Sequence, residues 1–60
     1  MEYYYDVFVK YNDEKEERVV ARQLTSAEMY TLFNYLLRER KRHYEYNMPR
    51  THYPEYVRVE

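Results

Sequence analysis

Apolar and polar residues alternate with a period of two in three segments of the chain. In residues 3–11 the odd positions are Tyr, Tyr, Val, Val and Tyr, and residues 18–24 and 55–59 alternate in a similar way. Successive side chains of a strand point to opposite faces, and β-branched and aromatic residues favour strands. We therefore predict three strands. The charged residues 12–16 between the first two strands predict a hairpin loop.

The middle of the chain has the period of an amphipathic helix. Apolar residues recur every three or four positions at Met29, Leu32, Phe33, Leu36 and Leu37. Before them, residues 25–28 (Thr-Ser-Ala-Glu) form a capping box, in which the Thr hydroxyl accepts from the Glu amide and the Glu carboxylate accepts from the Thr amide. This pattern predicts a helix over residues 26–46, which Asn47 and Pro49 end.

The order strand-strand-helix-strand predicts an α+β fold. We expect a three-stranded antiparallel sheet, in the order 2-1-3, with one long helix packed on one face. Sixty residues allow one small domain. A five-residue loop predicts the pairs Val9–Val19, Val7–Ala21, Phe8–Val20 and Asp6–Arg22. The expected core is Tyr5, Val7, Val9, Val19, Ala21, Met29, Leu32, Phe33, Leu36, Val57 and Val59.

Composition excludes several classes of site. The chain has no glycine, cysteine or tryptophan, and it has ten tyrosines. Without cysteine there is no disulfide framework or zinc finger, and without glycine there is no glycine-rich phosphate loop. No apolar run approaches the roughly 20 residues that span a bilayer, and no signal peptide opens the chain, so we expect a cytoplasmic protein with no membrane partner and no cofactor.

In the hairpin loop, Asn12 is the residue best suited to a positive φ.

The sheet face away from the helix is the strongest candidate site. If the helix covers the odd-numbered side, the other side carries three aromatics and four cations against one acid. Tyrosine, phenylalanine and arginine are enriched in protein interfaces. The predicted protein-binding residues are Tyr4, Phe8, Val20, Arg22, Tyr56 and Arg58.

The leading hypothesis is a small non-catalytic protein-binding module of the inhibitor or adaptor type. Its partner would be another protein or a second copy of the chain, through this face or an edge strand. The small size is compatible with a chain carried by a virus. An ordinary solvated face, and an engineered domain without natural function, are further interpretations.

The alternative partner is single-stranded nucleic acid. Aromatic rings can stack bases while cations meet the phosphates. The additional residues for this function would be Lys10, Arg18, Arg40, Lys41 and Arg42. The net charge of −1 favours a protein partner. Cations at the end of a helix also complement its dipole, without any ligand.

Catalytic and metal chemistry have little support. His43 lies four residues after Glu39, and His52 follows nine residues later, but this is not the spacing of a known metal motif. The hydroxyl residues Thr25 and Ser26 are explained by helix capping, and no nucleophile has a recognisable base and orienting partner. We therefore expect neither a metal site nor an enzyme.

Overall fold

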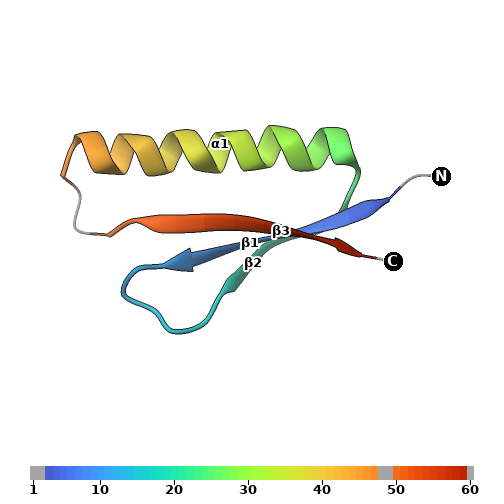
Figure 1. Cartoon of the computed structure of the whole chain (residues 1–60), viewed down its shortest axis with the longest axis horizontal. Coiled ribbons are helices and arrows are strands. Elements are labelled where there is room, and N and C mark those ends of the chain that lie inside the picture. Colours follow the sequence, from blue (N-terminus) through green and yellow to red (C-terminus); the bar gives the residue numbers. More distant parts are fainter. Residues whose placement is uncertain (1–2, 48–49, 60) are drawn as a thin grey trace.

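The described residues form three strands and one helix (Figure 1). The computed structural model describes residues 3–47 and 50–59. The elements are β1 (Tyr4–Tyr11), β2 (Arg18–Leu24), α1 (Ser26–Glu45) and β3 (His52–Val59). All strand pairs are antiparallel, and the strand order is β2-β1-β3. The predicted α+β fold, with its sheet order and single helix, is therefore confirmed.

The molecule is flat and elongated. Its Cα atoms extend over 42 × 22 × 11 Å. Helix α1 packs mainly on β3 and β1, and in Figure 1 β2 lies farthest from it. Because the single helix covers only one side of the sheet, the described residues leave the other side without a second layer.

The helix begins at the predicted residue, Ser26, and ends at Glu45, one residue before the predicted end. At its start the Thr25 hydroxyl accepts from the Glu28 amide at 3.3 Å, and the Glu28 carboxylate accepts from the Thr25 amide at 3.1 Å. The bond from the Thr25 amide, together with one from the Thr25 hydroxyl at 2.9 Å, holds the pKa of Glu28 below its usual range. At its end Asn47 has a φ of 50°, and its amide donates to the Tyr44 carbonyl at 3.3 Å. Pro49, the other predicted stop, lies outside the described residues.

The core between helix and sheet is small. Its buried members are Val7, Val9, Met29 and Leu36, and its half-buried neighbours are Tyr5, Tyr11, Leu24, Leu32 and Phe33. Three predicted core residues are wrong: Val19 is 46% exposed, Val57 is 53% exposed, and Val59 pairs with Tyr4 on the side of the sheet away from the helix. On the helix side of β3, the Tyr56 ring packs edge-on against the Phe33 ring at 5.1 Å, although Tyr56 is itself 45% exposed.

Strand β2 contains two bulges that the sequence did not predict. The observed pairs are Tyr5–Leu24, Val7–Ala21, Phe8–Val19 and Val9–Arg18. The Val7–Ala21 pair is as predicted, but Val20 is an extra residue, so Val19 and Val20 together oppose Phe8. This shift makes the predicted Phe8–Val20 and Val9–Val19 pairs wrong.

The second bulge lies where Arg22 and Gln23 together oppose Asp6. Gln23 has a φ of 56°, in the left-handed region that a glycine would adopt without strain. Asn12, the loop residue best suited to a positive φ, is not among the described residues that have one, which are Gln23 and Asn47. Asn12 has another role, because its amide donates to the Thr51 carbonyl at 3.0 Å and its side chain accepts from the Thr51 amide at 3.3 Å.

Strand β3 begins at His52, three residues earlier than predicted, and includes Pro54. Along an antiparallel pair of strands, hydrogen-bonded and non-hydrogen-bonded residue pairs alternate. The bond from the Asn12 amide to the Thr51 carbonyl makes Asn12 and Thr51 a hydrogen-bonded pair, which sets the alternation between β1 and β3. Pro54, which pairs with Val9, falls at a position that is not hydrogen-bonded, so its nitrogen faces the free edge. This register places even-numbered β3 residues on the helix side. The predicted orientation of β3 is therefore wrong.

Candidate functional site

The candidate site is the sheet face that α1 does not cover, which we call the open face. Directly paired residues of neighbouring strands share a face, so the pairing assigns most of its members. Val20 joins them because it opposes Phe8 in a bulge, and Arg22 joins them because it lies 3.5 Å from Asp6. The members of the open face are Tyr4, Asp6, Phe8 and Lys10 from β1, Val19, Val20 and Arg22 from β2, and Tyr53, Glu55, Val57 and Val59 from β3.

The open face is largely apolar and its charges balance. Exposed valines and tyrosines from all three strands surround the half-buried Phe8 in the central strand. The described residues of this face include two cations, Lys10 and Arg22, and two acids, Asp6 and Glu55. The predicted excess of four cations over one acid is therefore wrong, because the register of β3 and the bulges of β2 move arginines away.

Four of the predicted protein-binding residues lie together on the open face, namely Tyr4, Phe8, Val20 and Arg22. The other two do not. Tyr56 faces the helix, with its ring 6.0 Å from that of Tyr5, and Arg58 pairs with Tyr5 on the same side. The Arg58 guanidinium lies over the Tyr3 ring, 4.3 Å from its centroid.

Asp6, on the open face, contacts both Arg22 and the backbone amide of Gln23. Its carboxylate is buried, accepts from the Gln23 amide at 3.0 Å and lies 3.5 Å from the Arg22 guanidinium. The predicted pairing of Asp6 with Arg22 is therefore observed, and the carboxylate also satisfies the backbone of the bulge at Gln23. Because this charge is already paired and buried, covering the open face would require little further desolvation of Asp6.

The cations proposed for nucleic acid do not form one surface. Of the five, Lys10 lies on the open face, while Arg18 is an ion-pair partner of Glu14 at 2.7 Å. On the helix, Lys41 lies 3.9 Å from Glu45, and Arg42 lies 4.0 Å from Glu39. The Arg40 guanidinium, from α1, lies 4.3 Å from the centroid of the Tyr53 ring on the edge strand β3.

A cluster of aromatic and charged groups ties the hairpin loop to the segment before β3. The Tyr11 ring has the Arg50 guanidinium 3.9 Å from its centroid and that of Arg18 at 5.4 Å. Glu14 contacts Arg18 at 2.7 Å and Arg50 at 3.1 Å, and Asp13 contacts Arg50 at 3.1 Å. The hydrogen bond from Arg18 lowers the pKa of Glu14 and raises the pKa of Arg18.

The lowered pKa of Glu14 predicts a pH-dependent difference between the wild type and a Glu14→Gln variant. Ionised Glu14 stabilises the fold above its ordinary pKa of 4.5, and this contribution is lost as pH falls through the lowered value. We expect Glu14→Gln to lower the melting temperature at neutral pH and to match the wild type near pH 3. Glu16→Gln, in the same loop, is the control. A difference between wild type and Glu14→Gln that does not change with pH would contradict this role.

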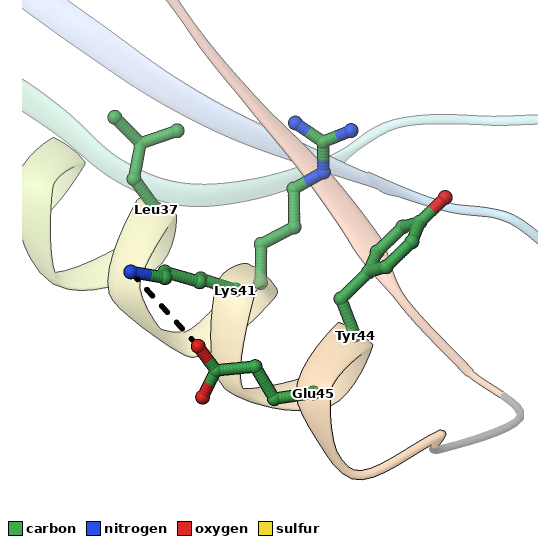
Figure 2. A pocket seen from close by; sticks show the side chains of 5 residues that line it. Leu37, Lys41, Tyr44 and Glu45 are labelled. Atoms are coloured by element: carbon green, nitrogen blue, oxygen red, sulfur yellow. Dashed lines mark ion pairs between the residues drawn. The ribbon is translucent and has the colours of Figure 1, made fainter.

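The C-terminal half of α1 carries a shallow hollow (Figure 2). Its volume is about 390 Å³, and it is lined by Leu37, Arg40, Lys41, Tyr44 and Glu45. Figure 2 shows Lys41 and Glu45 pointing toward each other on successive turns, at 3.9 Å. The charged ends of these two side chains pair with each other rather than converge on the hollow. This geometry gives no basis for assigning a catalytic group.

The two histidines meet at the junction of α1 and β3. Their rings are 5.6 Å apart, and the buried His52 donates from Nε2 to the Leu36 carbonyl at 3.1 Å. His43 lies 3.9 Å from Glu39. Within residues 3–47 and 50–59, no three His, Cys, Asp or Glu residues gather in a way that could hold a metal ion. The His52 bond instead fixes the start of β3 to the helix.

Comparisons of the chain with protein-family models, curated proteins and solved structures find no match. In the described part of the chain, no helix combines the length and the apolar character that a membrane crossing requires.

Proposed function

We propose that the protein is a small non-catalytic protein-binding module that contacts its partner through the open face. The observation that carries this proposal is the exposure of valine and tyrosine side chains from three adjacent strands around Phe8. Protein interfaces typically combine an apolar centre with a polar rim. Contiguous exposed apolar patches on small proteins mark interaction surfaces.

The chemistry of the open face favours protein over nucleic acid. A surface that binds single strands combines stacking rings with cations along the phosphate path. Here Tyr56, one of the rings predicted to stack bases, packs against Phe33 on the helix side. Of the two cations on the open face, Arg22 is paired with Asp6. An apolar, electrically balanced surface suits the side chains of another protein better than a polyanion.

The experiment is affinity capture from cell extract with the tagged chain and three variants. Val57→Lys and Tyr4→Lys place a cation on the open face, whereas Tyr35→Lys places one on α1 at a tyrosine of similar exposure, 50% against 45% for Tyr4. We expect both open-face variants to lose at least about tenfold in recovered partner, because a desolvated charge opposes binding. We expect Tyr35→Lys to retain the partner. Equal recovery by all four proteins would contradict the proposed surface.

A further inference from the structure

We infer that the occupant of the open face is a second copy of this chain. The inference rests on the proposed function, since it names the partner of the same surface. In the resulting dimer the two sheets pack face to face and the two α1 helices lie on the outside. Four properties of the chain support this arrangement: its surface area, its small core, its poorly pairing strand edges and the self-complementary charges of the open face.

The surface of the single chain is larger than its mass requires. Its accessible area is 4963 Å². A compact monomer of 7.7 kDa is expected to expose about 4,300 Å². The excess, roughly 600 Å², approaches the ~800 Å² that each partner buries in a standard interface.

The second copy would also supply a core that the single chain lacks. The buried core of the described chain consists of four hydrophobic side chains, all between α1 and the sheet. Two packed sheets lie about 10 Å apart, and side chains from both inner faces interdigitate. In the dimer Phe8, Val19 and Val57 of each copy would enter such a layer. Chains of this size are marginally stable alone, and oligomerisation is one way in which they gain stability.

The two free strand edges are poorly suited to pairing with another chain. At one edge β3 contains Pro54, which has no amide hydrogen to donate. At the other edge β2 contains two bulges, which disrupt the regular spacing of its hydrogen-bonding groups. Proline and bulges are devices by which natural sheets avoid association at their edges. Association through the open face is therefore favoured over association through a strand edge.

The charges of the open face suit a two-fold interface. A symmetric dimer uses the same patch on both copies, so the patch must complement itself. The open face has two charges of each sign among its described residues, and Asp6 and Arg22 already pair within one copy. Lys10 and Glu55 are diagonal neighbours on the same face, since Lys10 pairs with Tyr53 and Glu55 pairs with Phe8. A face with no excess of either sign does not repel its own copy.

The test is the molar mass in solution, measured by sedimentation equilibrium across micromolar concentrations. We expect the wild type and Tyr35→Lys to approach twice the 7.7 kDa of one chain. Val57→Lys and Val19→Lys change exposed positions on two different strands of the open face. We expect each to raise the dissociation constant of the dimer at least about tenfold. Circular dichroism of every sample reports whether the fold is retained.

The outcomes separate the inference from the proposed function. A wild type that stays monomeric, or a dimer that both lysine variants leave intact, would overturn the inference. If the wild type is monomeric but capture still depends on Val57, the proposed function stands with a different protein as partner. If Val57→Lys loses both dimer and fold while Tyr35→Lys keeps both, the inference is supported. A lysine at a position 53% exposed in the single chain would not unfold a self-sufficient monomer.

Discussion

Replacing Met29 by alanine is expected to remove most of the folding free energy of the protein. Met29 is 2% exposed and is one of the two largest fully buried side chains, with Val7. Truncating a buried methionine to alanine costs about 2–5 kcal/mol through lost burial and the cavity that remains. A chain of 60 residues has a total stability of roughly 3–9 kcal/mol. Few other buried side chains hold α1 on the sheet, so this loss has little to offset it.

Urea denaturation, followed by circular dichroism at one fixed protein concentration, measures this effect. The concentration must be fixed because dimer formation makes apparent stability depend on it. Leu37→Ala is the control, since Leu37 lies on the same helix but is 39% exposed, and we expect a smaller loss than for Met29→Ala. Equal losses for Met29→Ala and Leu37→Ala would show that the core is not where the structure places it.

Asp6→Ala is expected to have the second largest effect on stability. The substitution removes the acceptor of the Gln23 amide and the partner of the Arg22 guanidinium. A backbone amide left without an acceptor in a partly buried site costs about 1–3 kcal/mol. The cost is concentrated at the bulge, so the pairing of β2 with β1 should weaken next to the start of α1.

Asp6→Asn is the matched control for this prediction. Asparagine keeps an oxygen that can accept from the Gln23 amide but loses the negative charge beside Arg22. The expected order of stability in urea denaturation is therefore wild type, Asp6→Asn and then Asp6→Ala. Hydrogen exchange of the Gln23 amide should accelerate in Asp6→Ala. If Asp6→Ala and Asp6→Asn are equally stable, the hydrogen bond to Gln23 contributes nothing.

The sequence predicted the elements well where local chemistry sets their bounds. The Thr25–Glu28 capping box begins α1 as predicted, and Asn47 adopts the left-handed conformation at its end. The period of two predicted β2 over residues 18–24, the range that the structure shows. The sheet order also followed, because only one free edge could receive the third strand in an antiparallel arrangement.

The face of each strand was harder to predict than its position. In β3 the alternation places His52 and Tyr56 on one side and Val57 and Val59 on the other, and both sides are compatible with a core. The choice depends on the register of β3 against β1, which the local pattern does not contain. A strand predicted to start at His52 would have indicated the observed face, since the His52 ring then lies on the helix side with Tyr56.

The candidate site was predicted only in part, because its membership depends on which face of each strand points away from the helix. Tyr4 and Phe8 were placed correctly because they alternate along β1, and Val20 and Arg22 because they oppose Phe8 and Asp6 of that strand. Tyr53 and Val57 were missed, because the register of β3 decides which of its residues lie on the open face. A bulge is usually marked by glycine in a sequence. Here Gln23 adopts the positive φ, so no such mark was present.

The absence of glycine also has a consequence for the unfolded chain. Gln23 and Asn47 hold left-handed conformations, at φ values of 56° and 50°, that are roughly 1–2 kcal/mol less favourable for residues with a Cβ. Glycine would relieve this strain, but it would also give the unfolded chain more conformations to lose on folding, at a cost of about 0.4–1 kcal/mol. A chain without glycine is stiffer before it folds. Its lower conformational entropy partly offsets the strain that these two residues carry in the native state.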